Sequence, residues 1–449
     1  MQEVRNSNTV EITEERAERV VLAAVEEGVT ESTGDMSHRM DELASLAKAC
    51  YMEPVGMVIQ RLETVNKGLY MGAGKVQELK ELCVRLEADL VVFNNSLTPS
   101  QLRNLQDLLD VPVMDRTTLI LEIFESRART REARLQVETA KLQYLLPRLV
   151  GMHEALTRQG GTSGSMSSRG AGEKKLELDR RKIEHRIAEL QRELKEITKE
   201  REVQRSRRNK GRLPLVSLVG YTNAGKSTIM NAMVDRYAAG EEKRVLEKDM
   251  LFATLDTSVR RINTGDNRDF LLSDTVGFIH DLPHSLVKAF RSTLEEIENA
   301  DLLIQVVDYS DPFYEEQMKT TAQTLSELSA GHIPMLTVYN KADRREGASY
   351  PRTVGDKLFV SAKEEASLDL LVGEIIEKIY ADQVEGEFLI PFQRGDIVSY
   401  FMENAVILKR EYQEEGTLLL VKCHPADREK YRSYLTETGG GNDAEGKIE

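Results

Sequence analysis

The segment GYTNAGKST, residues 220–228, constrains the fold of this chain more than any other stretch. It follows the apolar run LPLVSLV and matches the pattern GxxxxGK[ST] in full, with Gly220, Gly225, Lys226 and Ser227 at the fixed positions. Such a loop joins a buried strand to the N-terminus of a helix, so that backbone N–H groups surround a chain of phosphates. We therefore expect an α/β domain with a parallel sheet around this segment.

The same loop carries side chains that act on phosphate. Lys226 is expected to reach the outer phosphates of a nucleotide, and the Ser227 hydroxyl is expected to ligate Mg²⁺. The alternative, a glycine turn that binds no phosphate, is disfavoured by the motifs further along the chain. The residues predicted to bind the nucleotide here are Gly220, Tyr221, Thr222, Asn223, Ala224, Gly225, Lys226, Ser227 and Thr228.

Three later motifs follow apolar strands in the order that a GTPase requires. In DTVGF, Asp274 is expected to hold Mg²⁺ through water, and the Gly277 N–H to contact the γ-phosphate. In NKAD, the Asp343 carboxylate can accept both N1–H and N2–H of guanine, a donor pair that adenine lacks. In SAK, the Ala362 N–H is expected to face guanine O6. The predicted GTP contacts in these motifs are Asp274, Thr275, Val276, Gly277, Asn340, Lys341, Asp343, Ser361, Ala362 and Lys363.

The catalytic group is predicted to consist of Lys226, Thr254 and Gly277. Thr254, in LFATLDTS, is expected to close over the γ-phosphate and ligate Mg²⁺, with Thr257 as the competing candidate. Phe278 follows Gly277 at the position where Ras-type enzymes keep the glutamine that orients water, and a phenyl ring cannot hydrogen-bond to water. We therefore predict a low intrinsic rate of GTP hydrolysis and a partner that completes or accelerates it.

Composition narrows the class of protein. With 449 residues, 40% hydrophobic and 30% charged, the chain is long enough for about two to four domains and too charged for a membrane protein. The start of the chain lacks the apolar segment of a signal peptide, so we expect a cytoplasmic protein. Cys50, Cys83 and Cys423 show no CxxC spacing, and we expect them to pack as small apolar residues.

The order of expected elements divides the chain into parts. Residues 20–114 alternate strand and helix patterns, including a helix with Thr98 as N-cap and Pro99 in its first turn, and they predict a small parallel sheet. The segment 115–150 is predicted to form one long helix. Its solvated face is expected to carry Arg127, Arg129, Arg131 and Arg134.

A second long helix is predicted over residues 173–204, and together the two helices suggest an antiparallel hairpin. The Gly/Ser-rich stretch RQGGTSGSMSSRGAGE connects them, and it is either a flexible linker or a loop presented to a phosphate-rich surface. The net charge of the chain is −14, yet residues 169–212 hold sixteen Lys and Arg against nine Asp and Glu. The apolar seam of the second helix is expected to consist of Leu176, Ile183, Ile187, Leu190, Leu194 and Ile197.

The predicted fold class is α/β, with a P-loop GTPase domain between a small α/β domain bearing a long helical hairpin and a small α+β domain. The expected boundaries are 1–115 for the N-terminal α/β domain, 116–212 for the basic hairpin, 213–382 for the GTPase domain, 383–436 for the α+β domain and 437–449 for a disordered tail.

With these motifs in place, the chain resembles the HflX family of the Obg–HflX group of P-loop GTPases. The resemblance rests on GYTNAGKST, LFATLDTS, DTVGF, NKAD and VVDYSDPFYEEQ, and it extends to MGAGKVQEL, FNNSLTPSQLRNL, the first long helix and SRGAGEKKLELDRR. Most of the chain is covered. The departures lie in the hairpin loop, where the family shows more glycine and a GPGE-TQLE pattern and this chain has Ala171, Lys174 and Lys175.

The resemblance implies a GTPase that associates with the large ribosomal subunit and splits or rescues stalled or stressed ribosomes. The basic hairpin would then contact ribosomal RNA, and the protein is expected to act as a monomer. The asparagine at position 223 resembles that of GTPases that use K⁺ in place of an arginine finger, so Asn223 is a candidate K⁺ ligand beside Mg²⁺.

Other functions remain open at this point. The main alternative is a GTP-dependent ribosome-assembly or RNA-binding module with little intrinsic hydrolysis. A GTPase of the tRNA-modifying or membrane-transport class is disfavoured by the missing transmembrane segment and modification-type cysteine, and an ATP-driven helicase by NKAD. Gly72, Gly74 and Lys75 resemble half of a P-loop, and they mark either a helix entry or a second phosphate site.

Overall fold

The computed structural model describes residues 16–28, 33–159, 166–209, 213–237, 251–252, 258–281 and 296–436. Part of the expected Gly/Ser-rich loop and the whole expected tail lie outside these ranges. The chain forms two compact units, one of Met1–Ser126 with Val137–Gln191 and the other of Arg127–Gln136 with Arg192–Glu449. No helix within the described ranges combines the length and the hydropathy that a membrane crossing requires.

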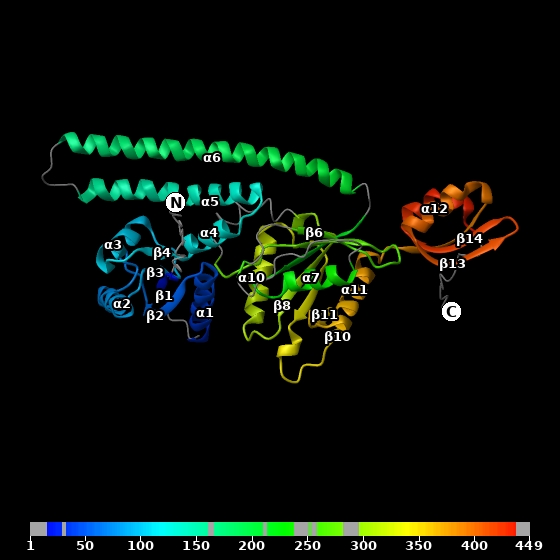
Figure 1. The fold of residues 1–449 in the computed structure, drawn as a ribbon, viewed down its shortest axis with the longest axis horizontal. Helices are drawn as coiled ribbons and strands as arrows, with labels where there is room; N and C mark the ends of the chain where they lie inside the picture. Colours follow the sequence, from blue (N-terminus) through cyan, green and yellow to red (C-terminus); the bar gives the residue numbers. More distant parts are fainter. Residues whose placement is uncertain are drawn as a thin grey trace, which may run out of the picture. The chain divides into compact units, whose positions relative to one another are not determined.

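The first unit contains a four-stranded sheet in the order β2-β1-β3-β4 (Figure 1). All three strand pairs are parallel, which confirms the sheet predicted from the alternation of strand and helix patterns. Its strands are β1 (Arg19–Glu27), β2 (Glu53–Leu62), β3 (Leu90–Phe93) and β4 (Val113–Asp115), and its helices are α1 (Thr33–Ala49), α2 (Ala73–Leu86) and α3 (Pro99–Leu109).

Alternate residues of β1 point to opposite faces of this sheet. Val21, Ala23 and Val25 belong to a core that the inner sides of α2 and α3 complete. The expected N-cap of α3 is confirmed, because Thr98 Oγ1 accepts from the Gln101 N–H (3.3 Å) and the Gln101 side chain accepts from the Thr98 N–H (2.9 Å). The Gly72–Lys75 segment forms the start of α2, as a helix entry would.

The expected single helix over residues 115–150 is wrong. The chain forms α4 (Arg116–Arg127) and, after a break at residues 128–130, α5 (Arg131–Gln159). Thr130 explains the break, because its Oγ1 accepts from the Ala133 N–H (3.1 Å) and so caps the new helix. The expected solvated position of Arg127 is also wrong, since this residue is buried.

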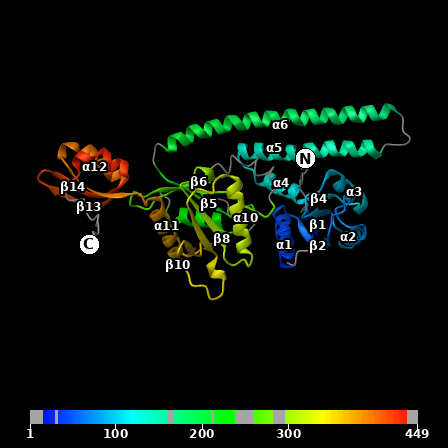
Figure 2. The same cartoon turned by 180° about the vertical axis from the view of Figure 1, so that it is seen from behind.

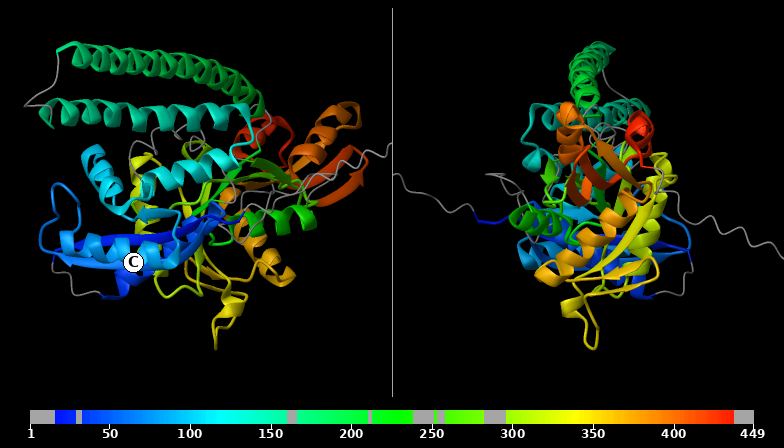
Figure 3. Two further views of the ribbon diagram at one scale, coloured as in Figure 1. Left: turned by 60° about the vertical axis from the view of Figure 1, so that its left-hand side comes forward. Right: turned by 90° about the vertical axis from the view of Figure 1, so that its right-hand side faces the viewer.

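Helix α6 (Met166–Asn209) runs antiparallel to α5, as Figures 2 and 3 show from two directions. Arg186 of α6 and Glu138 of α5 form an ion pair (2.8 Å), and Leu190 of the expected seam is fully buried. Ile183 and Ile187 are half-buried, so the seam is present but only partly covered. The expected hairpin of two long helices is therefore correct in outline.

The second unit contains a seven-stranded sheet in the order β10-β11-β9-β8-β5-β7-β6, antiparallel at β10 and β6 and parallel between. Its strands are β5 (Leu215–Gly220), β6 (Ser258–Ile262), β7 (Phe270–Asp274), β8 (Leu302–Asp308), β9 (Met335–Asn340), β10 (Arg352–Val354) and β11 (Lys357–Phe359). The edge strands β6 and β10 were not expected from the sequence, because neither has an apolar run.

Helices cover both faces of this sheet. Helices α7 (Lys226–Tyr237) and α11 (Glu365–Ile379) pack on the face that contains Val216 and Leu218, and α10 (Tyr314–Glu327) packs on the face that contains Val219 and Leu303. With both faces buried, the central strands are almost continuously apolar. The arrangement brings the loops after β5, β7, β9 and β11 to the carboxyl edge of the sheet.

The last described segment forms an antiparallel sheet in the order β12-β14-β13. Its strands are β12 (Val384–Ile390), β13 (Val406–Gln413) and β14 (Gly416–Cys423), and α12 (Gly395–Asn404) covers one face through Ile397 and Phe401. Cys423 lies in this core and Cys83 in the core of the first unit, as small apolar residues would, while Cys50 is half-buried.

Candidate nucleotide-binding site

The loop between β5 and α7 has a backbone that only glycine fits at two positions. Gly220 has φ +139°, and a Cβ there would lie 2.2 Å from Val306 O of the neighbouring strand. Gly225 has φ +98°, and a Cβ there would lie 2.2 Å from Asn340 Nδ2. Both values of φ belong to a region that residues with a Cβ rarely adopt. The two fixed glycines of the motif thus set the path of the loop around the phosphate site.

Lys226 lies at the centre of this loop. Its Nζ donates to Gly220 O (3.1 Å) and Tyr221 O (2.7 Å), and the residue is buried. Burial lowers the pKa of its ammonium group to about 8, with Lys341 adding to the shift and Asp274 opposing it. Among the described residues, the hydrogen bonds of this buried cation go to two carbonyl oxygens, so the ammonium group is well placed to gain from an incoming polyphosphate.

Ser227 and Asp274 meet at the start of α7. Ser227 Oγ donates to Asp274 Oδ2 (2.7 Å), and Asp274 is fully buried at the end of β7. P-loop GTPases generally use Mg²⁺, which is bound through one or two protein oxygens together with substrate phosphates. These two oxygen donors fit that pattern, and they are the residues that would hold the ion. Among the described residues, no group of three or more His, Cys, Asp or Glu side chains could hold a metal ion by itself.

The DTVGF loop is joined to the phosphate loop by backbone hydrogen bonds. The Thr222 N–H donates to Phe278 O (2.8 Å), and the Phe278 N–H donates to Gly220 O (3.1 Å). A Cβ on Gly277 would lie 2.7 Å from Thr222 Cγ2 and 3.0 Å from Lys226 Nζ, so this glycine lies directly against the phosphate loop. The Phe278 ring is 2% exposed and packs in the hydrophobic core with Val219 and Leu325, away from the site.

A cavity of about 190 Å³ adjoins the phosphate loop and contains the residues expected to bind the base. Asp343 lies exposed at its rim and accepts no hydrogen bond from the described part of the chain. The cavity is lined by Asn223, Gly225, Thr228, Asn340, Lys341, Asp343, Arg344, Ser361, Ala362 and Lys363. The phosphate loop, NKAD and SAK, which lie apart in the sequence, therefore converge on one pocket.

Asn340 connects these motifs. Its Nδ2 donates to Ala224 O (3.0 Å) and its Oδ1 accepts from the Ala362 N–H (3.0 Å). The contact of the Ala362 N–H with guanine O6 stays a prediction, because in this structure, which contains no nucleotide, the N–H donates to Asn340 Oδ1. A base carbonyl would have to compete with that bond.

Sequence reasoning missed Asp308 as part of the site. Lys341 Nζ donates to Asp308 Oδ2 (2.7 Å) and to Asn223 O (2.7 Å), so the ion pair supports the base pocket and the phosphate loop together. The available signal was the position of Asp308 at the end of the central strand β8, in VVDYSD. Asn223 itself is exposed, with φ +59°. Thr254 and Thr257 lie outside the described residues.

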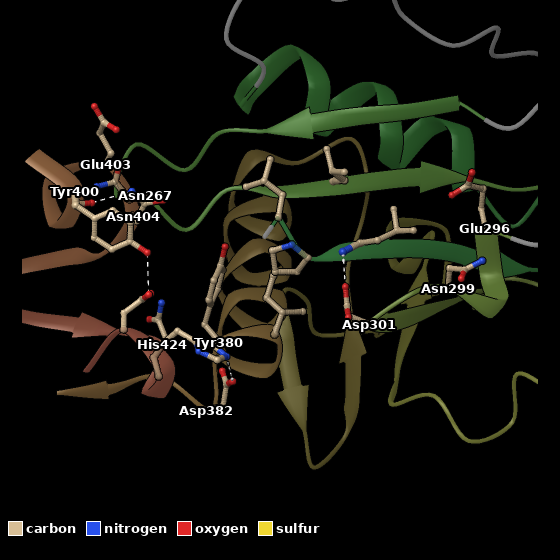
Figure 4. Close-up of a pocket in the computed structure, with 17 residues that line it drawn as sticks. Asn267, Glu296, Asn299, Asp301, Tyr380, Asp382, Tyr400, Glu403, Asn404 and His424 are labelled. Carbon is tan, nitrogen blue, oxygen red and sulfur yellow. Dashed lines mark hydrogen bonds and ion pairs between the residues drawn. The ribbon is translucent and has the colours of Figure 1, made fainter. Parts of the chain in front are cut away.

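A larger cavity, of about 490 Å³, lies elsewhere in the second unit (Figure 4). Its walls include Pro214, Leu215 and Asp301, which lie at the amino ends of β5 and β8, together with Tyr400 and His424 from the segment after residue 382. The nucleotide-binding motifs follow the carboxyl ends of the strands. This cavity is therefore separate from the predicted nucleotide-binding site, although it is larger than the cavity beside the phosphate loop.

The fold and the site define a P-loop GTPase domain with a guanine-type base pocket. Family models give the same class: "GTP-binding GTPase N-terminal" matches residues 37–125, "GTP-binding GTPase Middle Region" residues 127–208, and "50S ribosome-binding GTPase" residues 215–341. The chain belongs to the HflX family of GTPases, and it binds and hydrolyses GTP.

Family membership rests on relatives that match along most of their length. A protein named "GTPase HflX" from Caldanaerobacter subterraneus is 40% identical, with 93% of this chain and 94% of that protein covered. The Escherichia coli protein of the same name is 38% identical, with 85% and 88% covered. The solved structure titled "crystal structure of SsGBP and GDP complex" is 23% identical with a TM-score of 0.44, covering 80% of this chain and 98% of that one, and at that score it supports no conclusion.

Proposed function

We propose that this GTPase binds the large ribosomal subunit and splits or rescues stalled or stressed ribosomes. The observation that carries the proposal is the match of residues 215–341 to a family described as a 50S ribosome-binding GTPase, within a chain that resembles HflX proteins along most of its length. A cytoplasmic, ribosome-associated monomer follows from the same proposal. We also propose domain boundaries at residues 115, 212 and 382.

Helix α6 has an exposed basic face that could bind ribosomal RNA. Arg192, Lys195 and Lys199 are exposed, and their spacing places them on one face of the helix. They form no ion pair with the described residues, whereas the nearby Arg180 is paired with Glu184 (2.9 Å). Exposed cations without a protein partner are the ones free to replace counterions along a phosphate backbone. We propose that this face of α6 contacts ribosomal RNA.

A triple substitution tests this surface. Replacing Arg192, Lys195 and Lys199 with Gln should weaken binding to purified large subunits and lower the slope of log affinity against log salt by about two to three. The matched control replaces Arg180, Arg181 and Lys182, whose charges are already paired with acidic residues of the same helix. Equal loss of affinity in both variants would show a general charge effect and no defined surface.

Hydrolysis is proposed to need the partner, because Phe278 points into the core and supplies no polar group. We also propose that Ser227 and Thr254 ligate Mg²⁺, that Asp274 holds it through water, and that the exposed Asn223 helps to bind K⁺ near the phosphates. The ions would neutralise charge that develops on the phosphates during hydrolysis. Equal turnover in sodium and potassium buffers would remove the K⁺ assignment.

The deciding experiment measures GTP hydrolysis in potassium buffer with and without purified large ribosomal subunits. Strong stimulation, followed by a subunit-splitting assay, is the expected result. Binding to the subunit without stimulated hydrolysis would favour the second candidate, a GTP-dependent assembly or RNA-binding module. Absence of binding would overturn the ribosomal proposal.

A further inference from the structure

The phosphate loop contains a buried hydroxyl without an evident structural role. Thr222 is 6% exposed, and its Oγ1 finds no hydrogen-bond partner among the described residues. Its backbone N–H, in contrast, is engaged with Phe278 O (2.8 Å). A buried hydroxyl that forms no hydrogen bond costs the folded state free energy, so a position that keeps one suggests a partner supplied from outside the chain.

Thr222 adjoins two residues that are expected to contact the γ-phosphate, Gly277 and Lys226. A Cβ built on Gly277 would approach Thr222 Cγ2 to 2.7 Å, Thr222 Cα to 2.8 Å and Lys226 Nζ to 3.0 Å. The side chain of Thr222 is thus in contact with the glycine of DTVGF and near the lysine of the phosphate loop. P-loop GTPases place the lysine at the outer phosphates, where the attacking water must also bind.

Three side chains of the phosphate loop and the DTVGF loop are engaged elsewhere. Phe278 is in the core, and Thr275 Oγ1 donates to Leu218 O (2.6 Å). Ser227 Oγ donates to Asp274 (2.7 Å) and belongs to the Mg²⁺ side of the site. The Tyr221 hydroxyl accepts from the His280 N–H (2.9 Å), whereas Thr222 Oγ1 is a buried hydroxyl of this loop pair that forms no hydrogen bond with the described residues.

We propose that Thr222 Oγ1 accepts a hydrogen bond from the attacking water and donates one to an oxygen of the γ-phosphate. A hydroxyl has one donor and two acceptor lone pairs, so it can make both bonds at once. The water oxygen then forms its bond to the γ-phosphorus as the bond to the β–γ bridging oxygen breaks, which gives GDP and inorganic phosphate. The proton from water leaves with the phosphate or enters solvent, and Thr222 remains neutral throughout.

Two variants separate the hydroxyl from the shape of the side chain. Thr222→Val removes the hydroxyl and keeps the branched shape, whereas Thr222→Ser keeps the hydroxyl and removes the methyl group. The matched control is Thr321→Val, which removes another buried hydroxyl. Thr321 lies in α10, outside the nucleotide motifs, and its hydroxyl donates to Gln317 O (2.9 Å). All variants are made in the full chain and measured under single-turnover conditions with GTP, so that product release does not enter the rate.

Thr222→Val should hydrolyse GTP about a hundredfold to a thousandfold more slowly, the range found when one preorganised hydrogen-bond donor is removed. Its affinity for GDP should stay within about twofold of the unmodified protein, because GDP lacks the γ-phosphate. The tighter binding of GDP that aluminium fluoride normally produces should be lost in Thr222→Val. Thr222→Ser should keep most of the rate, and Thr321→Val should keep all of it.

Stability gives a readout that is independent of activity. Because Thr222→Val removes an unsatisfied buried group, the nucleotide-free variant should melt at the same temperature as the unmodified protein or higher. Thr321→Val should melt close to the unmodified protein, because the helix carbonyl that loses the Thr321 hydroxyl keeps its main-chain hydrogen bond. Unmodified single-turnover kinetics in Thr222→Val would overturn the proposal. So would equal slowing in Thr222→Val and Thr222→Ser, which would assign the effect to packing.

Discussion

Ser227 Oγ and Asp274 Oδ2 form a hydrogen bond of 2.7 Å between residues 47 positions apart in the sequence. The bond joins the phosphate loop to the DTVGF motif before any ion is bound. Since both oxygens fit an Mg²⁺ site, we predict that Ser227→Ala lowers GDP affinity about tenfold or more in Mg²⁺ and by less than about twofold in EDTA. Titration of a fluorescent GDP analogue in both buffers measures the difference.

The neighbouring Ser273 provides the control for that experiment. Ser273 precedes Asp274 in β7 and is fully buried, and its hydroxyl lies within hydrogen-bond distance of Ser217 Oγ of β5 (2.7 Å). Ser273→Ala should therefore keep the full response of GDP affinity to Mg²⁺. An unchanged response in Ser227→Ala would show that its hydroxyl is not a ligand.

The pKa of Lys226 predicts how nucleotide affinity depends on pH. Burial lowers this pKa to about 8 in the nucleotide-free protein, and bound phosphates favour the charged form and raise it again. Below pH 8 the lysine is charged in both states, and GDP affinity is independent of this group. Above that pH binding must take up a proton, so affinity should fall by up to about tenfold per pH unit.

The measurement is GDP affinity between about pH 7 and pH 9. Lys226→Met should bind GDP weakly and show no such slope. The free energy of unfolding of the nucleotide-free protein should change with pH in the opposite direction to GDP affinity. The unfolded chain keeps the proton up to the ordinary lysine pKa of 10.5, so stability rises with pH above about 8. Constant affinity across the range would contradict an essential charge on Lys226.

Gly225 allows a prediction about stability. A Cβ at this position would lie 2.2 Å from Asn340 Nδ2 in a backbone with φ +98°, so Gly225→Ala should destabilise the protein by about 1–3 kcal/mol and weaken GDP binding. Gly373 in α11 has no atom within 4 Å of a Cβ, and Gly373→Ala should instead stabilise by about 0.5–1 kcal/mol. Denaturant unfolding of both variants tests the pair, and equal effects would contradict the steric argument.

The sequence predicted the nucleotide motifs well because each follows an apolar strand and therefore lies at one edge of a parallel sheet. Local periodicity could not show that Thr130 starts a new helix or that Arg127 is buried, because both depend on contacts distant in the sequence. The same limit applied to Asp308 and to the Ala362 N–H. Their hydrogen bonds to Lys341 and Asn340 exist only once β8, β9 and the loop after β11 are side by side.

The identity of the bound base is predicted to depend on Asp343, which is exposed at the rim of the cavity. Its carboxylate can accept two hydrogen bonds from guanine, whereas an amide offers one acceptor and one donor. Asp343→Asn should lower GTP affinity by about two orders of magnitude or more and improve binding of the xanthine nucleotide, which has a carbonyl at position 2. Competition between the two nucleotides measures the switch, and the exposed Glu346→Gln is the control. Unchanged preference for guanine in Asp343→Asn would place base recognition elsewhere.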